Sequence, residues 1–271
     1  MEDLAGRTAV VTGGASGIGL ATSRLFAAEG MNVVLADMEA SALDGAVAEV
    51  AAGGSAVEGV VCDVSRKADV DALAERAYER FGAVHIVFNN AGVAVGGPTA
   101  EMTHADWQWL VDVNLWGPIH GIEAFVAPMV AAGEGGHVLF TASFAGLAPN
   151  VGLGPYCVTK YGVVAMAEVL QKELRGNGIG VSVLCPMRVA TNIGRSERNR
   201  QDAYGGPEAS HPVEAQGDDN PNQAGRVLDV EDVAAEVLDA VRRNRLYIVP
   251  HAESRRFVEN RFNRIMAAYE P

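Results

Sequence analysis

A tyrosine and a lysine four residues apart form the pair in this sequence best suited to proton chemistry. Tyr156 and Lys160 stand in the segment Tyr-Cys-Val-Thr-Lys, and on a helix this spacing places both side chains on one face. A free tyrosine has a pKa of about 10, which is too high for an efficient base near neutral pH. Because a neighbouring ammonium favours the phenolate, the spacing predicts a tyrosine that works as a base.

Ser143 lies thirteen residues before Tyr156 and follows a run of apolar and β-branched residues. A hydroxyl at the end of a strand can stabilise an oxygen on which negative charge develops. Each of the three residues also has an ordinary structural explanation, as a turn cap, a packed aromatic or a solvated lysine. Their combination with a cofactor loop in the same chain favours the catalytic interpretation.

A glycine-rich loop, TGGASGIG at positions 12–19, follows the first predicted strand and opens the first predicted helix. Glycines let the backbone approach a pyrophosphate, and the helix N-terminus offers free N–H groups and the positive end of its dipole. The loop alone could equally be a glycine-rich turn. The cofactor contacts expected from it are Gly13, Ser16, Gly17, Ile18 and Gly19.

Asp37 stands at the end of the second predicted strand, eighteen residues after Gly19. A carboxylate there can accept hydrogen bonds from both hydroxyls of an adenosine ribose. A 2′-phosphate at the same place would be repelled, by about 4 kcal/mol for unit charges about 4 Å apart at an effective dielectric of about 20. Since neither Ser16 nor Met38 supplies a compensating cation, the expected cofactor is NAD rather than NADP.

Short β-branched runs alternate with longer amphipathic segments along the chain. Strands are expected at 8–12, 32–36, 56–61, 84–88, 137–141, 181–185 and 246–249. Helices are expected at 18–29, 42–51, 69–81, 106–131, 155–175 and 230–243. This alternation predicts an α/β fold with a Rossmann-type, doubly wound, parallel seven-stranded sheet and helices on both faces, in three α/β/α layers.

The stretch from Gly194 to Arg226 breaks this alternation. It is polar, it contains Pro207, Pro212 and Pro221, and it shows no period, so it is expected to be a mobile loop. All 271 residues are expected to form a single NAD-binding catalytic domain, with a mobile substrate loop at about 187–227. A single open α/β sheet can hold a chain of this length around one core.

Composition narrows the possible partners. The chain has 34 acidic and 21 basic residues, a net charge of −13, which predicts repulsion of nucleic acid and of anionic lipid. No apolar run reaches about 18 residues and the first residues are acidic, so the chain is expected to be cytoplasmic and without a membrane anchor. Three widely spaced cysteines and six histidines without short ligand spacing argue against a disulfide scaffold and a metal site.

These motifs resemble those of the short-chain dehydrogenase/reductase family, in its compact single-domain branch, from about Arg7 to Thr191. Several separate motifs occur in the family's order, which is more specific than any one of them. The matching residues are the glycine loop, Asp37, Asp63-Val64, Asn89-Asn90-Ala91-Gly92, Asn114, Ser143, Tyr156, Lys160 and Pro186.

The resemblance implies further cofactor contacts. It implies that Asp63 holds the adenine amino group and that the backbone of Val64 completes this contact. The other contacts expected from it are Met38, Asn90, Ala91 and Gly92 around the adenosine and Pro186, Val189 and Thr191 beside the nicotinamide.

The expected reaction is hydride transfer between a secondary alcohol, or its ketone, and the nicotinamide. Ser143 and Tyr156 are expected to hydrogen-bond the substrate oxygen, and Tyr156 to take its proton as general base. Lys160 is expected to lower the pKa of Tyr156 and, by the resemblance, to hydrogen-bond the nicotinamide ribose. The resemblance also implies that the backbone carbonyl of Asn114 holds a water that connects Lys160 to solvent.

The expected substrate is a hydrophobic secondary alcohol or ketone. The resemblance implies a pocket wall formed by Val93 to Gly97, Phe144 to Leu153 and the loop after Met187. Much of this wall is apolar, through Phe144, Leu147, Val151 and Leu153. Met187 follows Pro186 where the family commonly has glycine, which predicts a different pocket shape. The family habit implies a homotetramer or homodimer, with the helices at 106–131 and 155–175 in the interface.

Two other functions fit part of the pattern. A nucleotide-sensing, NAD-binding protein without turnover would keep the glycine loop, but it has no need for the serine, tyrosine and lysine together. A sugar-nucleotide epimerase or dehydratase uses the same tyrosine and lysine. Those enzymes usually carry a larger C-terminal substrate domain than the roughly eighty residues that follow Pro186 here.

Overall fold

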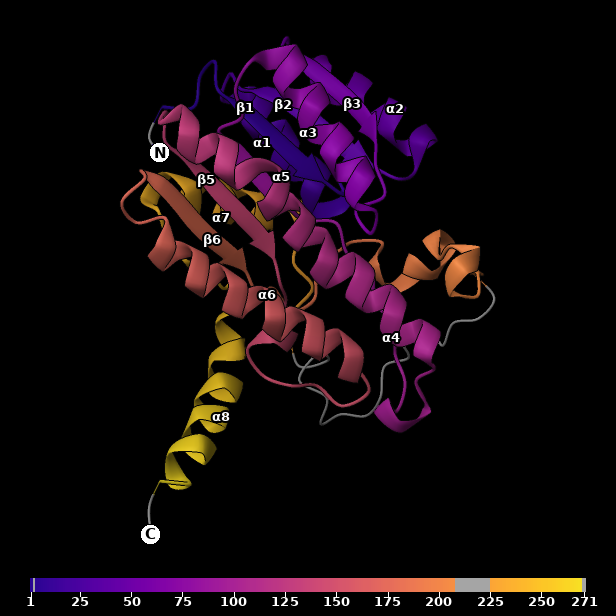
Figure 1. Ribbon diagram of the computed structural model, residues 1–271. Helices are drawn as coiled ribbons and strands as arrows, with labels where there is room; N and C mark the ends of the chain where they lie inside the picture. Colours follow the sequence, from indigo (N-terminus) through magenta and orange to yellow (C-terminus); the bar gives the residue numbers. More distant parts are fainter. Residues whose placement is uncertain (2, 208–224, 270–271) are drawn as a thin grey trace.

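The computed structural model describes residues 1, 3–207 and 225–269, and its centre is one parallel sheet (Figure 1). The sheet has seven strands in the order β3-β2-β1-β4-β5-β6-β7. They are β1 (Thr8–Thr12), β2 (Asn32–Asp37), β3 (Val57–Val61), β4 (Ile86–Asn89), β5 (Gly136–Thr141), β6 (Ile179–Leu184) and β7 (Tyr247–Ile248). The order reverses between β1 and β4, so the predicted doubly wound fold is confirmed.

Helices cover both faces of the sheet (Figure 1). One face is covered by α1 (Gly17–Ala28), α2 (Ala40–Ala51) and α7 (Val230–Arg243). The other is covered by α3 (Lys67–Phe81), α5 (Gly117–Ala132) and α6 (Gly154–Glu173), next to α4 (His104–Val111). The last helix, α8 (Arg255–Ala267), extends away from these layers.

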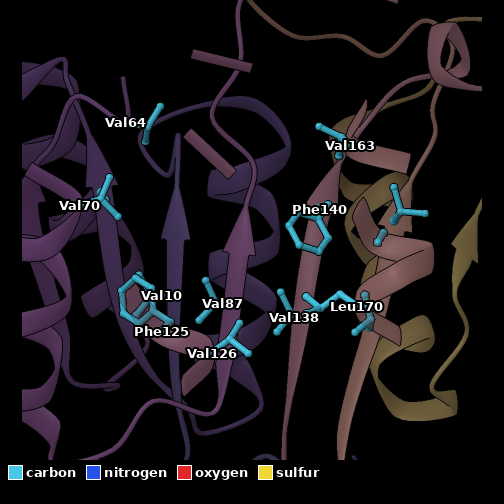
Figure 2. Close-up of a cluster of buried hydrophobic side chains, with 14 of the residues drawn as sticks. Val10, Val64, Val70, Val87, Phe125, Val126, Val138, Phe140, Val163 and Leu170 are labelled. Atoms are coloured by element: carbon cyan, nitrogen blue, oxygen red, sulfur yellow. The ribbon is translucent and has the colours of Figure 1, made fainter. Parts of the chain in front are cut away.

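The central strands are buried on both sides, which explains their nearly continuous apolar sequences. Val10 of β1 packs into the core beneath α5, where Figure 2 shows it beside Phe125, whereas Ala9 and Val11 face the opposite core. The edge strand β3 departs from this pattern, and Val61 at its end is 60% exposed.

The prediction of a single long α-helix at 106–131 is wrong. Between α4 and α5 the chain forms a π-helical turn, η2 (Asp112–Trp116). At its centre the Asn114 side chain accepts a hydrogen bond from the Val93 N–H at 2.8 Å and donates one to the Val93 carbonyl at 2.8 Å. Pro118, four residues after Asn114, has no N–H to donate to the Asn114 carbonyl. In this turn the Gly117 N–H donates to the carbonyl of Asp112, five residues earlier, in place of the regular four-residue helical bond.

The start of α4 is fixed by side-chain capping. Thr103 and Asp106 form a capping box, in which the Thr103 hydroxyl accepts from the Asp106 N–H and the Asp106 carboxylate accepts from the Thr103 N–H. Such reciprocal bonds satisfy two N–H groups that the helix leaves free. The capping box fixes Asp106, whose carboxylate has a second partner far along the chain.

The first part of the predicted loop contains secondary structure that the sequence analysis does not predict. Residues 193–204 contain two 3₁₀ helices, η4 (Ile193–Asn199) and η5 (Asp202–Tyr204). Between them Arg200 donates to Asp106 at 2.6 Å, and neither side chain is exposed. Residues 208–224 of the predicted loop lie outside the described residues. They include Pro212 and Pro221. Among those that are described, no helix is both long and apolar enough to cross a membrane.

Breaking this buried ion pair should cost far more stability than breaking an exposed one. Arg200→Met would leave the Asp106 carboxylate buried without its cation, at an expected cost of about 3 to 5 kcal/mol of unfolding free energy. Arg198→Met is the matched control, because the Arg198–Glu39 pair is more than 30% exposed on both sides and should cost about 1 kcal/mol or less. Urea unfolding measures both, and equal losses would contradict the assignment of Arg200 as the anchor of this segment.

Candidate active site

A cavity lies at the carboxyl ends of the parallel strands, where the sheet order reverses. Ligands of open α/β sheets bind at this position. Of the residues predicted to bind the cofactor, all but Gly19 line the cavity, and so does Ser143. Lining residues that the sequence did not single out include Glu39, Trp109, Val113, Ile193, Ser196, Arg198 and Asn199.

The glycine loop shapes one wall of the cavity, but its glycines serve different purposes. Gly17 has a φ of +56° and faces Thr191, so a side chain there would be strained. A Cβ at Gly19 would lie 2.2 Å from the Gly13 carbonyl oxygen and 2.6 Å from the Asn90 amide. Gly19 therefore lets α1 pack closely against the loop, and its contact with the cofactor stays a prediction.

The N-terminus of α1 faces the cavity, and its first turn contains no acidic side chain. Ser16 is its N-cap residue, makes no side-chain capping bond, and is followed by no acidic residue in the first turn. Ser16, Gly17 and Ile18 all line the cavity. A helix start of this kind can bind a phosphate through its free N–H groups and its dipole.

Asp37 is fixed at the end of β2 by the backbone. Its carboxylate accepts hydrogen bonds at 3.1 Å from the N–H groups of Ala15 and Glu39. Burial raises the pKa of Asp37, and these two N–H groups oppose that shift. The carboxylate is thus oriented into the cavity by the glycine loop itself, a contact that the spacing of eighteen residues could not show.

Asp63 is already hydrogen-bonded on both oxygens. One oxygen accepts from the N–H and the hydroxyl of Ser65, at 3.0 and 2.7 Å, and the other accepts from the Gln201 amide at 2.7 Å. Each carboxylate oxygen has two lone pairs, so an adenine amino group could still be a further donor. The contact with Gln201 brings the segment 193–204 against this end of the cavity.

Asn90 ties three strands together, as the amides at this position are predicted to do. Its side chain donates to the carbonyls of Thr12 and Gly13, at 3.0 and 3.2 Å. It also accepts from the Thr141 hydroxyl at 2.9 Å. The ends of β1, β4 and β5 are therefore held in register beneath the cavity.

Ser143, Tyr156 and Lys160 meet at the opposite end of the cavity from Asp37. Ser143 follows β5 and hydrogen-bonds the Tyr156 hydroxyl, while Tyr156 and Lys160 lie in the first turns of α6. The Lys160 ammonium lies 5.5 Å from the centre of the Tyr156 ring and donates to the Thr141 carbonyl at 2.8 Å. The structure thus brings together the three residues that the sequence separates by up to seventeen positions.

The pKa of Tyr156 is shifted in the direction opposite to the one expected. Burial raises it to about 12, and the hydrogen bond with Ser143 opposes the shift only in part. Burial also lowers the pKa of Lys160 to about 8. In both groups the removal from water opposes the charged form, so burial acts against the phenolate that the spacing predicts.

Asn114 does not line the cavity. It is fully buried, and its side chain holds the backbone of Val93. A Cβ at Gly92 would lie 3.2 Å from the Asn114 side-chain oxygen and 3.5 Å from the Lys160 nitrogen. Gly92 therefore leaves room for Asn114 and Lys160 to lie close together.

The segment 193–204 forms a wall of the cavity through polar contacts to three strand ends. Arg198 and Asn199 both donate to Glu39, at 2.6 and 2.7 Å. Ser196 accepts from the Ala94 N–H at 3.0 Å. These partners are more than a hundred positions away, so no local pattern could identify them.

The predicted apolar pocket wall is partly wrong. Phe144, Leu147, Val151 and Leu153 do not line the cavity. Phe144 is buried and packs against Phe257, and Val151 is 76% exposed. Val93 and Met187, both part of the predicted site, do line the cavity, and Trp109, Val113 and Ile193 add apolar lining that was not predicted.

Residues that could hold a metal do not gather near this site. Among the residues the structure describes, no cluster of three or more histidine, cysteine or carboxylate side chains could bind a metal ion. Cys62, Cys157 and Cys185 are buried free thiols. The polar groups that line the cavity suit an organic ligand with hydroxyl and phosphate groups.

Comparison with known proteins agrees with this architecture. The C alpha-dehydrogenase of Sphingobium sp. (strain NBRC 103272 / SYK-6) is 33% identical, over 100% of this chain and 89% of the relative. The 1-deoxy-11-beta-hydroxypentalenate dehydrogenase of Streptomyces exfoliatus is 35% identical, over 95% and 87%. A short-chain dehydrogenase/reductase from Burkholderia phymatum, solved in complex with NAD, is 37% identical, covers 100% of this chain and 98% of that one, and has a TM-score of 0.90.

The family comparison covers the glycine loop together with Ser143, Tyr156 and Lys160. The model described as short chain dehydrogenase matches residues 7–202, which is more than half of the chain. This range includes the glycine loop, Asp37, Ser143, Tyr156 and Lys160. The chain belongs to the short-chain dehydrogenase/reductase family of oxidoreductases.

Proposed function

We propose that this protein is an NAD-dependent oxidoreductase that transfers a hydride between a secondary alcohol, or its ketone, and the nicotinamide. The observation that carries this proposal is the placement of Ser143, Tyr156 and Lys160 in one cavity with Asp37 and the open N-terminus of α1. Proton chemistry and a dinucleotide site thus meet at one edge of the sheet. The proposal treats the chain as one catalytic domain, and the homodimer or homotetramer stays a prediction.

The lining residues fit a dinucleotide from end to end. The uncapped start of α1 would receive the pyrophosphate, and Asp37 would accept the adenosine ribose hydroxyls. Asp63 and Val64 would hold the adenine, and Pro186, Val189 and Thr191 would border the nicotinamide. The nicotinamide would supply the hydride acceptor at its C4 atom.

Charge at the ribose end supports NAD as the cofactor. Asp37 lies beside a second acid, Glu39, whose carboxylate is bonded by Arg198 and Asn199. The Arg198 guanidinium, which lines the cavity, is already paired with Glu39 at 2.6 Å. A 2′-phosphate would meet the Asp37 carboxylate without a free counter-charge, which disfavours NADP.

Tyr156 would be the general acid/base. Ser143 and Tyr156 would hydrogen-bond the substrate oxygen, and Tyr156 would take the hydroxyl proton as the carbinol hydride leaves. Because burial raises its pKa to about 12 in the chain alone, Tyr156 needs more positive charge than Lys160 supplies, and a bound oxidised nicotinamide carries that charge. A positive charge beside the phenol favours the phenolate.

Lys160 and Asn114 would return the proton to solvent. Lys160 lies beside Tyr156, and Asn114 packs behind it across Gly92. The residue four positions after Asn114 is Pro118, which has no backbone N–H. The Asn114 carbonyl therefore receives no hydrogen bond from that residue and is suited to hold a water. The lowered Lys160 pKa of about 8 lets this ammonium give up a proton at mildly alkaline pH.

The pH dependence of the reaction follows from these shifts. Alcohol oxidation needs Tyr156 deprotonated, so its kcat/KM should rise with pH, and Lys160→Met should displace the rise to higher pH. Ketone reduction needs Tyr156 protonated and should fall as pH rises. Initial rates in both directions test this, and oxidation that is independent of pH would contradict the assigned base.

The lining of the cavity favours a hydrophobic substrate. Val93, Trp109, Val113 and Met187 provide apolar surface in the same cavity as the catalytic residues. Apolar walls with few polar groups suit an alcohol on a hydrocarbon or aromatic frame. The two relatives described above, both named as dehydrogenases, support oxidation as the direction to test first.

A panel of secondary alcohols tests this function. NADH formation from NAD would be followed with terpenoid, sterol, aryl and alicyclic alcohols, and with diols and free sugars for comparison. We expect turnover with one or more hydrophobic alcohols and none with free sugars. Tight NADH binding without turnover on the whole panel would favour a nucleotide sensor, and conversion of a nucleotide sugar without net NADH formation would favour an epimerase.

A further inference from the structure

A buried histidine outside the catalytic group holds the turn that follows β6. His251 lies after β7 and is 0% exposed. Its Nδ1 atom accepts a hydrogen bond from the Met187 N–H at 3.2 Å. Its Nε2 atom lies 3.1 Å from the carbonyl oxygens of both Arg188 and Arg226.

The partners of His251 determine its tautomer. A backbone N–H can only donate, so Nδ1 must be an acceptor. Two carbonyl oxygens can only accept, so Nε2 must carry the hydrogen. His251 is therefore the neutral Nε2–H tautomer, and every polar atom of its ring is used.

These contacts join both described ends of the predicted substrate loop at 187–227. Met187 and Arg188 begin the loop, and Arg226 stands at its other end. Beside them Leu228 donates to the Arg188 carbonyl at 3.0 Å and Ala190 donates to the Leu228 carbonyl at 2.9 Å. His251 thus adds side-chain contacts to the backbone hydrogen bonds that hold the two described ends of the loop together.

The braced turn also touches the catalytic elements. The Pro186 carbonyl accepts from the Phe144 N–H at 2.8 Å, next to Ser143. Pro186, Met187, Val189 and Thr191 all line the cavity. A shift of Met187 would therefore move the wall against which a nicotinamide ring would lie.

We propose that His251 is a positioning residue for hydride transfer, which fixes the Pro186-Met187 turn against the nicotinamide through its bond to the Met187 N–H. This inference rests on the proposed function. A bulky residue at position 187 in place of the family's usual glycine narrows the space at this turn, and the histidine fixes its backbone. His251 touches neither the catalytic side chains nor the adenosine end of the cavity.

Two substitutions of similar size separate the contacts of His251. Asparagine places its side-chain oxygen near the position of Nδ1 and can keep the Met187 bond. Glutamine places its amide nitrogen near the position of Nε2, so it can keep a carbonyl bond while losing the Met187 bond. His251→Gln should therefore displace the turn, and His251→Asn should largely preserve it.

Binding of NADH relative to ADP-ribose is the measurement, because the two ligands differ by the nicotinamide ring. In His251→Gln the Kd for NADH should rise about tenfold, or about 1.4 kcal/mol, while the Kd for ADP-ribose stays within about twofold. His251→Asn should keep both values near wild type. An unchanged ratio in His251→Gln, or an equal loss in His251→Asn, would overturn the proposal.

A second buried histidine provides the control for a general loss of stability. His137 is 1% exposed and bonds Ser182 from the start of β5, at the opposite end of the sheet. His137→Asn should lower the melting temperature without changing the NADH to ADP-ribose ratio. If the wild type binds NADH but oxidises no alcohol, the proposed function fails, and the binding ratio still decides the role of His251.

Discussion

Replacing Tyr156 by phenylalanine should lower kcat for alcohol oxidation by about a thousandfold. General acid–base catalysis contributes about a hundred- to ten-thousandfold, and in the proposed site no other side chain can take the hydroxyl proton directly. Phenylalanine keeps the aromatic ring and its packing. The Kd for NADH should therefore stay within about threefold of wild type. Steady-state rates and NADH fluorescence titration measure the two quantities.

Tyr161 provides the matched control on the same helix. Its hydroxyl is buried and makes no hydrogen bond to any of the described residues, and it does not line the cavity. Tyr161→Phe should leave kcat within about twofold of wild type. Turnover that survives in Tyr156→Phe, or that falls equally in both variants, would contradict the assignment of Tyr156 as general base.

Wild-type protein should prefer NAD over NADP by about a hundredfold in kcat/KM, and Asp37→Ser should remove most of that preference. The repulsion of about 4 kcal/mol between unit charges about 4 Å apart is reduced by solvent, which leaves roughly two orders of magnitude. Serine removes the charge and can still hydrogen-bond a ribose hydroxyl. The variant should gain activity with NADP and lose activity with NAD.

Asp63→Asn is the control that distinguishes loss of charge at the ribose from loss of charge elsewhere in the cavity. Asp63 lines the same cavity, but it lies at the proposed adenine end and is bonded by Ser65 and Gln201. Its substitution should weaken the binding of both cofactors to a similar extent. The ratio of kcat/KM with NAD to kcat/KM with NADP should stay within about threefold of wild type. Similar wild-type efficiencies with NAD and NADP, or a preference unaffected by Asp37→Ser, would remove the proposed basis for NAD selectivity.

The sequence was informative where function or burial imposes a local pattern. The strand at Thr8–Thr12 and the helix at Val230–Arg243 have the predicted bounds, because β-branched runs and amphipathic periodicity are local signals. The capping box at Thr103 is a local feature of the same kind, because its two residues lie three positions apart. The loop before α1 and the tyrosine–lysine pair have fixed spacings, so they predicted the position of the cavity.

The features that sequence reasoning missed depend on distant partners. The ordered segment 193–204 is anchored by Asp106, Glu39 and Asp63, and no composition rule pairs these residues. The π-helical turn at Asn114 depends on the backbone of Val93, which comes from another strand end. Such contacts become apparent only when the sheet brings the segments together.

The pKa of Tyr156 shows why spacing alone is insufficient for electrostatics. The four-residue interval correctly brings Lys160 near Tyr156, at 5.5 Å from the ring centre. It carries no information about burial, which raises the tyrosine pKa to about 12 and lowers the lysine pKa to about 8. Solvent access depends on the whole fold, so the sign of the shift could not be read from the motif.

Transfer of deuterium from an alcohol to NAD would test the central proposal most directly. The hydrophobic alcohol with the highest turnover would be labelled at its carbinol carbon and incubated with protein and NAD. Mass spectrometry and proton NMR of the recovered NADH would locate the label. We predict one deuterium at nicotinamide C4 on a single face, and none with Tyr156→Phe within the same time. Alcohol oxidation without deuterium in NADH, or label transfer that persists in Tyr156→Phe, would contradict hydride transfer with Tyr156 as its base.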